Sequence, residues 1–326
     1  MKILYVTNMY PNERDPNYGI FVKEQIDAIE RLYDIEKTVY VIDGKNGLKE
    51  YIKSIFDIRK TIKKGCFDLI HVHYGLSGLF LLLGRMKVPV LMTLHGGDIQ
   101  AEQGKAVQVA LTKQILKKCD FVITLNKKMD EIARKFVHQT RIVPCSVNTH
   151  FFIELSPREK VRSNTVRILF PSSRNRYVKD FPLFQKTCEV LRQRYKLIIE
   201  EYYLENLSRK QVAGLFNQMD VLLMTSISEG SPQVVKEAMA CNLPVVSTNV
   251  GDVSVLLDGV KDSYVSSSRD ETELAELVYK SLCEQKEGIS PRDKIAQLEL
   301  DDDHIAKRLI SIYHNMIGDS LSRHSA

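Results

Sequence analysis

Short runs rich in β-branched residues alternate with longer amphipathic stretches along the whole chain, and this alternation constrains the fold more than any other feature. The short runs predict strands at residues 3–7, 38–42, 68–73, 89–94, 121–125 and 141–143, and again at 166–170, 197–199, 221–224 and 244–247. Helical patterns lie between them, as in Phe21–Leu32, where apolar residues recur near a 3.6-residue period. Strands that alternate with helices are typical of parallel sheets with crossover helices, so the sequence predicts an α/β fold.

The chain length and a break between the two strand series predict two domains. At roughly 150 residues per domain, a chain of 326 residues is long enough for two. The polar stretch Phe151–Thr165 separates the two series. We therefore expect one doubly wound, Rossmann-like domain over residues 1–150 and a second over residues 151–326, closed by a helix that begins near Asp301. The content of 44% hydrophobic and 27% charged residues excludes a disordered or fibrous chain.

Neither a membrane-spanning segment nor a secretory signal is expected. The longest uninterrupted apolar run covers only residues 79–83, whereas a spanning helix needs about 20 apolar residues. The N-terminus has no extended apolar region followed by a small-residue cleavage site. The six cysteines stand alone without a C-x-x-C pair, and none is flanked by a histidine, so we interpret them as reduced core thiols of a cytoplasmic protein rather than catalytic groups.

Positive charge is concentrated in the first half of the chain. Residues 1–150 carry a formal charge of +7 and residues 151–326 carry −2. Much of the excess falls on one predicted helix and its exit: Lys45, Lys49, Lys53, Arg59, Lys60, Lys63 and Lys64. A solvated helix face is the simplest interpretation. The alternative is a surface for an anionic membrane or an anionic acceptor, since each basic residue near such a membrane contributes on the order of 1 kcal/mol. Nucleic acid is not expected as a partner, because no basic strand pattern with interleaved aromatic residues accompanies the charge.

Polar segments follow several predicted strands, at the edge of the sheet where ligands bind in doubly wound folds. His95-Gly96-Gly97-Asp98 follows one strand, and Glu229-Gly230-Ser231-Pro232-Gln233-Val234-Val235-Lys236-Glu237 follows another. Pro232 suits the first helical position and Ser231 the cap before it, which predicts a helix N-terminus able to bind a phosphate. Glu229 and Glu237 would then lie at the two ends of this anion site and could hold sugar hydroxyls.

A second loop follows the strand at 166–170 and carries the cations Arg174, Arg176 and Lys179. These cations could neutralise a diphosphate, although solvated loop residues are an equal interpretation. His71 and His73 alternate on one strand but have no carboxylates at ligand spacing, so we expect no metal site.

Taken together, these segments resemble glycosyltransferase family 4, a group of retaining GT-B enzymes. The segment from Glu229 to Glu237 is similar to the family's E-x7-E motif, and Arg174 with Lys179 is similar to its diphosphate-binding pair. Further similar segments are Asp68-Leu69-Ile70-His71-Val72-His73, Thr93-Leu94-His95-Gly96-Gly97-Asp98, Pro144-Cys145-Ser146-Val147-Asn148 and Gly251-Asp252-Val253.

The resemblance implies two Rossmann-like domains that face an interdomain cleft holding a nucleotide-diphosphate sugar. Glu237 would bind the ribose, Glu229 the sugar hydroxyls, and Arg174 with Lys179 the phosphates. His95 would approach the transferred sugar, and Gly19 would let the first loop come close to it. The other residues implied in donor binding are Gly230, Ser231, Pro232, Gln233, Val234 and Val235.

The implied activity is retaining sugar transfer without a metal, a cofactor or a protein nucleophile, because the departing phosphate helps to deprotonate the incoming hydroxyl. We expect a UDP-sugar as donor and a glycan or lipid-linked saccharide as acceptor, in cell-surface polysaccharide synthesis. The expected location is the cytoplasm, with the inner face of the plasma membrane as a possible peripheral site. Two alternatives are left open. One is a sugar-nucleotide epimerase of the same fold, which needs no acceptor, and the other is a scaffold that binds a sugar nucleotide without turnover.

Overall fold

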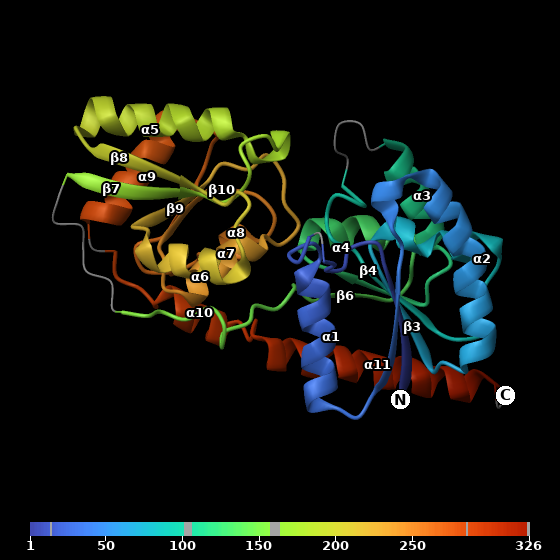
Figure 1. Cartoon of the computed structure of the whole chain (residues 1–326). Coiled ribbons are helices and arrows are strands. Elements are labelled where there is room, and N and C mark those ends of the chain that lie inside the picture. The colour runs from blue at the N-terminus through green and yellow to red at the C-terminus, as the bar shows by residue number, and fades with distance from the viewer. Residues whose placement is uncertain (14, 101–105, 157–163, 285, 325–326) are drawn as a thin grey trace. The chain divides into compact units, whose positions relative to one another are not determined.

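The computed structural model describes residues 1–13, 15–100, 106–156, 164–284 and 286–324. The chain divides into two compact units (Figure 1). Unit 1 is Met1–Cys145 together with Asp302–Ala326, and unit 2 is Ser146–Asp301. Each unit is built on a parallel sheet with interleaved helices. The predicted α/β class with two Rossmann-like domains is thereby confirmed.

The sheet of unit 1 has six strands in the order β2-β1-β3-β4-β5-β6, and every neighbouring pair is parallel. The strands are β1 (Lys2–Thr7), β2 (Glu36–Val41), β3 (Leu69–His73), β4 (Val90–Thr93), β5 (Phe121–Thr124) and β6 (Thr140–Ile142). The helical segments are α1 (Ile20–Leu32), η1 (Gly44–Asn46), α2 (Leu48–Gly65), η2 (Gly75–Leu83), α3 (Ala106–Leu116), α4 (Lys127–Ala133) and α11 (Asp302–His324).

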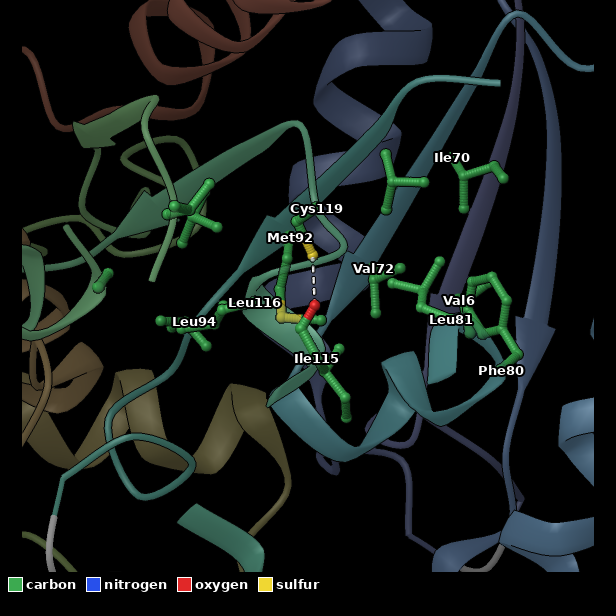
Figure 2. Close-up of a cluster of buried hydrophobic side chains, with 14 of the residues drawn as sticks. Val6, Ile70, Val72, Phe80, Leu81, Met92, Leu94, Ile115, Leu116 and Cys119 are labelled. Atoms are coloured by element: carbon green, nitrogen blue, oxygen red, sulfur yellow. Dashed lines mark hydrogen bonds between the residues drawn. The ribbon is translucent and has the colours of Figure 1, made fainter. Parts of the chain in front are cut away.

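Strands covered on both faces explain the continuous apolar runs of the sequence. Figure 2 shows one such covered face, where residues of the strands meet residues of η2 and α3. The labelled side chains of this cluster are Val6, Ile70, Val72, Met92 and Leu94 with Phe80, Leu81, Ile115, Leu116 and Cys119. The core therefore holds the sheet rigidly, and the loops at its edge are free to carry polar groups.

The sheet of unit 2 has five strands in the order β11-β10-β9-β7-β8, again all parallel. The strands are β7 (Thr165–Phe170), β8 (Ile198–Tyr203), β9 (Val221–Met224), β10 (Val245–Thr248) and β11 (Tyr264–Ser266). The helical segments are η3 (Tyr177–Lys179), α5 (Phe181–Tyr195), α6 (Arg209–Gln218), α7 (Gln233–Ala240), α8 (Val253–Leu256), α9 (Glu271–Cys283) and α10 (Pro291–Gln297). The edge strand β11 was not predicted, because its three residues form no recognisable apolar run.

Helix starts in both units coincide with polar capping side chains, which accept hydrogen bonds from the first backbone N–H groups. The capping residues are Asn126 of α4, Asp180 of α5, Ser208 of α6, Asp270 of α9 and Ser290 of α10. Ser208 and Gln211 form a complete capping box, which fixes the position at which α6 begins.

The observed units differ from the predicted ranges 1–150 and 151–326 at both boundaries. Residues 146–150 belong to unit 2, and helix α11 belongs to unit 1 rather than to the second domain. The apolar side of α11 is buried against unit 1, where α11 packs on α1 and the Tyr313 hydroxyl bonds to His71. Of the predicted linker 151–165, residues 157–163 lie outside the described residues.

Four cysteines (Cys119, Cys145, Cys188 and Cys241) are buried, and Cys66 and Cys283 are exposed, all as free thiols. The prediction of core thiols therefore holds for the four buried cysteines. In the described part of the chain, none of the helices combines the length and the apolar character needed to cross a membrane.

Candidate functional site

The strand order of unit 2 has a topological switch point beside β7. The chain passes from β7 to β8 on one side and then returns to β9 on the other side, so the connections diverge between β7 and β9. Ligands bind at such a switch point, beyond the carboxyl ends of the strands. The loops that follow β7 and β9 are the two that carry the predicted cations and the first glutamate of the E-x7-E segment.

Lys179 and Glu229 meet at this switch point. The Lys179 ammonium lies 2.5 Å from Oε1 of Glu229, and Ser226 donates a hydrogen bond to the same oxygen at 2.8 Å. Lys179 is only 7% exposed. The two loops are also tied through their backbones, because the Thr225 hydroxyl donates to the Lys179 carbonyl at 3.0 Å. The sequence therefore identified two residues that the fold brings into direct contact.

Glu237 points from α7 toward the start of α6. Its Oε1 accepts a hydrogen bond from the Arg209 guanidinium at 3.0 Å, and that guanidinium also lies 4.8 Å from the ring centre of Phe152. Burial raises the pKa of Glu237 above its usual value, and the charge of Arg209 opposes this rise. Glu237 is thus a buried carboxylate held by one cation.

Arg209 was not predicted as a site residue. The capping box at Ser208 could have placed Arg209 at a helix start, but nothing in the sequence indicates that α6 begins beside α7. The contact depends on packing between helices that are distant in sequence.

Arg174 does not join the pair formed by Lys179 and Glu229. Its guanidinium instead pairs with Glu205 at 3.1 and 3.2 Å and stacks 4.8 Å from the ring centre of Tyr203. Arg174 remains exposed to solvent, and its hydrogen bonds to Glu205, together with its charge, lower the pKa of Glu205. The predicted cation pair is therefore divided between two carboxylates in the free protein.

The predicted cap of α7 is wrong in its details. The helix begins at Gln233, Pro232 occupies the cap position, and the cap makes no side-chain hydrogen bond. The Ser231 hydroxyl donates instead to Asp252 at 2.6 Å and accepts from Lys236 at 3.1 Å, because these two buried groups need a polar partner.

Two groups in the first turn of α7 have partners that the sequence did not indicate. The Val235 N–H is bonded to the Pro232 carbonyl, and the Gln233 side chain donates to the Ser146 carbonyl. Val234 lies between these two residues in the first turn of α7.

Gly251 allows the loop that carries Glu229 to pack directly against the backbone of residue 251. It has a positive φ of 61°, and a Cβ at this position would lie 2.6 Å from the Gly230 carbonyl oxygen. A side chain there would push the loop away, so glycine is required for this close approach.

The predicted residues of unit 1 gather around His95. The Asp98 carboxylate accepts hydrogen bonds from the N–H groups of His95, Gly96 and Gly75 at 3.0–3.1 Å, which fixes the loop after β4. Burial raises the pKa of Asp98 to about 6 and lowers that of His95 to about 3. His95 therefore carries a neutral imidazole at neutral pH, able to accept or donate one hydrogen bond.

Gly19 lies close to the same region of unit 1. It is the residue before α1 and has a φ of 68°, and a Cβ there would lie 2.3 Å from the Met9 carbonyl group. Phe21, two residues later, packs with its ring centre 5.0 Å from that of His95. The fold thus brings the start of α1, which follows Gly19, into contact with His95 through Phe21.

Both histidines of β3 lie in the core. His71 bonds to the Tyr313 and Thr93 hydroxyls at 2.7 Å each, and His73 bonds to His95 at 3.3 Å. Within the described ranges, no group of three or more His, Cys, Asp or Glu residues is arranged to hold a metal ion. Metal independence itself remains a prediction.

Comparison with known proteins gives matches over most of the chain. Residues 11–151 match the family described as Glycosyltransferase Family 4, and residues 168–284 match Glycosyl transferases group 1. The Bacillus subtilis protein named "Putative teichuronic acid biosynthesis glycosyltransferase TuaC" is 23% identical, over 78% of this chain and 83% of that protein.

Two solved structures show the same fold. Sucrose-phosphate synthase from Thermosynechococcus elongatus has a TM-score of 0.77 and 17% identity, covering 98% of this chain and 99% of that one. The Anabaena protein HepE, solved in complex with UDP, has a TM-score of 0.69 and 14% identity, covering 97% of this chain and 100% of that one. The two family matches lie on successive parts of the chain, and the fold is shared over nearly its full length. The chain is therefore a family 4-like glycosyltransferase with the GT-B fold.

Proposed function

We propose that the chain transfers a sugar, with retention, from a nucleotide-diphosphate sugar to a hydroxyl of a glycan or lipid-linked saccharide. The observation that carries this proposal is the ion pair of Lys179 with Glu229 at the switch point of unit 2. It places a buried cation, suited to a phosphate, beside a carboxylate suited to sugar hydroxyls. A UDP-sugar is the favoured donor because HepE, which shares the fold, is solved with UDP.

The proposed donor contacts follow from the charges of unit 2. Glu237 accepts hydrogen bonds from the ribose hydroxyls, and Arg209 favours its ionised form against the effect of burial. Lys179 and Arg174 interact with the two phosphates, and Glu229 accepts hydrogen bonds from the sugar. Each of these carboxylates has a cation as partner in the free protein, so donor binding exchanges one polar partner for another.

The proposed reaction occurs on one face of the sugar. The bond from the anomeric carbon to the phosphate oxygen breaks, and a bond to the acceptor oxygen forms on the same side. The acceptor proton goes to the departing phosphate oxygen. Lys179 and Arg174 stabilise the negative charge that develops on the phosphates, so no metal is required in this proposal.

A role in cell-surface polysaccharide synthesis is supported by the name of the Bacillus relative, which refers to teichuronic acid. The location in the cytoplasm and the contact of His95 with the transferred sugar stay predictions. The neutral imidazole of His95 is suited to a hydrogen bond with a sugar hydroxyl.

Ligand binding is the first test. Melting temperatures are measured with UDP, GDP, ADP and their sugar conjugates in the presence of EDTA, because a ligand that binds only the folded state raises the melting temperature. We expect a shift with the uridine series that is lost in Glu237→Gln and retained in Glu189→Gln, a matched change at an exposed position of α5. No shift with any nucleotide, or an equal shift in Glu237→Gln, would contradict the donor site.

Turnover distinguishes the proposal from its alternatives. With the donor that binds and a saccharide acceptor, the anomeric configuration of the product is determined by NMR. Retention is the expected result, and inversion would refute the mechanism. A new sugar nucleotide formed without any acceptor would identify an epimerase. Donor binding without turnover on any acceptor would favour the scaffold.

A further inference from the structure

Helix α2 of unit 1 exposes a row of large apolar side chains. Leu48, Ile52 and Phe56 are spaced four residues apart, so they follow one another along a single side of the helix. Their exposed fractions are 71%, 50% and 63%. Single exposed apolar residues need no explanation, whereas a contiguous row of them marks a surface that contacts another apolar medium.

Five exposed lysines flank this apolar row. At 100° per residue, Lys49, Lys53, Lys60 and Lys64 lie on the side next to the row, and Lys63 lies in line with the row about two turns beyond Phe56. Both acidic residues of the helix, Glu50 and Asp57, lie beyond the lysines on the side away from the row. The outward surface of α2 is therefore apolar along one side and positively charged along the other. We call Leu48, Ile52 and Phe56 with these five lysines the α2 face.

The opposite side of the helix holds α2 firmly on unit 1. Ser54 and Ile58 are buried, and Ile55 and Ile62 pack against the core cluster. Figure 1 shows α2 at the outer edge of unit 1. The α2 face is thus presented by a rigid helix rather than by a loop.

The end of η2 extends the apolar surface. Arg59 of α2 donates hydrogen bonds to the carbonyl oxygens of Phe80 and Gly84 at 3.0 and 3.2 Å, so the last residues of η2 lie against the helix. Leu82 and Leu83, at this end of η2, are both exposed. The apolar row of α2 therefore has further exposed leucines beside it.

We propose that the α2 face docks on the surface of an anionic lipid bilayer, with the helix axis in the plane of the headgroups. An amphipathic helix with a basic polar face inserts its apolar side into the boundary between headgroups and acyl chains. The helix is about 27 Å long over its 18 residues, and the apolar row covers about 12 Å of this length, from Leu48 to Phe56. The lysines contact anionic headgroups, and each one strengthens binding about fivefold. The proposal does not depend on the proposed function.

Charge and polarity favour a bilayer over other occupants of the α2 face. A second copy of the chain docked face to face would bring two rows of five lysines together, which is unfavourable. A nucleic acid offers phosphates to the lysines but no apolar medium to the row of Leu48, Ile52 and Phe56. An anionic bilayer supplies both, because its headgroups offer negative charge to the lysines and the acyl chains below them offer an apolar medium to the row.

The test is co-flotation of the full chain with vesicles of phosphatidylcholine alone or mixed with phosphatidylglycerol. We expect binding to the mixed vesicles and little binding to phosphatidylcholine. Ile52→Ser/Phe56→Ser should weaken binding at least about tenfold, because less apolar surface is buried. Lys60→Glu should weaken binding about 25-fold, since it changes the charge by two units at about fivefold each. In 1 M salt, where the screening length is about 3 Å, binding should be lost.

Matched controls separate the α2 face from general effects. Val255→Ser removes an exposed apolar side chain from α8, and Lys186→Glu reverses an exposed charge on α5, and both should bind like the wild type. All the changed side chains of α2 are exposed, so the melting temperatures should not change. Equal binding by the α2 variants and the controls would overturn the proposal, as would no binding of the wild type to anionic vesicles. A dimer in gel filtration that only the α2 variants lose would also overturn it, in favour of self-association.

Discussion

Replacing Lys179 with methionine tests whether its ion pair with Glu229 serves the reaction or only the fold. The two charged atoms lie 2.5 Å apart, and the side chains are 8% and 15% exposed. Removing one partner of a fully buried ion pair costs about 3–5 kcal/mol, because the other charge is left without compensation. Glu229 keeps the Ser226 hydroxyl as a donor and some access to solvent. We therefore expect Lys179→Met to lose about 1–3 kcal/mol of unfolding free energy.

The expected effect on the reaction is separate from this effect on stability. If Lys179 stabilises the charge that develops on the departing phosphates, kcat should fall about 10²–10³-fold, as it does when one electrostatic stabiliser is removed. The assay is the initial rate of product formation at saturating donor, well below the melting temperature of the variant. Denaturant unfolding of the same preparation gives the change in stability.

Arg167→Met provides the matched control. Arg167 pairs with Asp220 at 3.1 Å, at the start of β9 and so at the edge of the sheet opposite the switch point. Arg167→Met should lower the unfolding free energy less than Lys179→Met does, because Arg167 is far more exposed than Lys179. It should leave kcat unchanged. The reasoning is refuted if Lys179→Met lowers kcat no more than Arg167→Met does.

Three further perturbations test single positions. Removing Arg209 should raise the pKa of Glu237 further. A carboxyl with a raised pKa binds its proton more tightly in the folded state than in the unfolded state, so its contribution to stability is lost as the pH rises. In denaturant melts at a series of pH values, the stability of Arg209→Ala relative to the wild type should therefore fall as the pH rises above about 4.5. For Asp98, with its pKa raised from 3.8 to about 6, stability is lost as the pH rises through that interval, so the wild type should lose about 2 kcal/mol relative to Asp98→Asn between pH 4 and 6 in the same melts. Gly19→Ala should lower the free energy of unfolding by at least about 2 kcal/mol, because Gly19 has a positive φ and a Cβ there would lie 2.3 Å from the backbone of Met9. Gly214→Ala in α6, where a Cβ meets nothing, should raise it by about 0.5–1 kcal/mol. Equal melting temperatures for these two variants would contradict this argument.

The regular elements could be predicted because their signals are local. Strands buried on both faces must be apolar without interruption, and the predicted strand at 221–224 coincides with β9. The apolar pattern near Pro182–Leu191 predicts a helix, and α5 continues beyond it to Tyr195, because its last turn is mostly polar and adds no apolar period. The strand β11 was missed, since Tyr264–Ser266 is held in place by its neighbour β10 and not by any pattern of its own.

Features that depend on packing could not be predicted. Helix α11 has an apolar side in the sequence, but the sequence does not say which sheet that side covers. Ser231 lies in a sequence that is typical of a helix cap, yet its hydroxyl bonds to the buried Asp252 and Lys236 instead of capping α7. In the candidate site, the E-x7-E motif located Glu229 and Glu237. The partners of these carboxylates come from other loops, and only the fold reveals them.

Three of the ion pairs of unit 2 explain why the proposed site should bind a whole sugar nucleotide better than its fragments. In the free protein, Lys179, Arg209 and Arg174 are each paired with a carboxylate. A diphosphate alone would draw Lys179 away and leave Glu229 buried without its cation, which is costly. A sugar alone would supply hydroxyls to carboxylates that are already satisfied, and would gain little. Only a ligand that brings phosphates and hydroxyls together gives every displaced charge a new partner, so recognition of the phosphates and of the sugar is energetically coupled through these shared pairs.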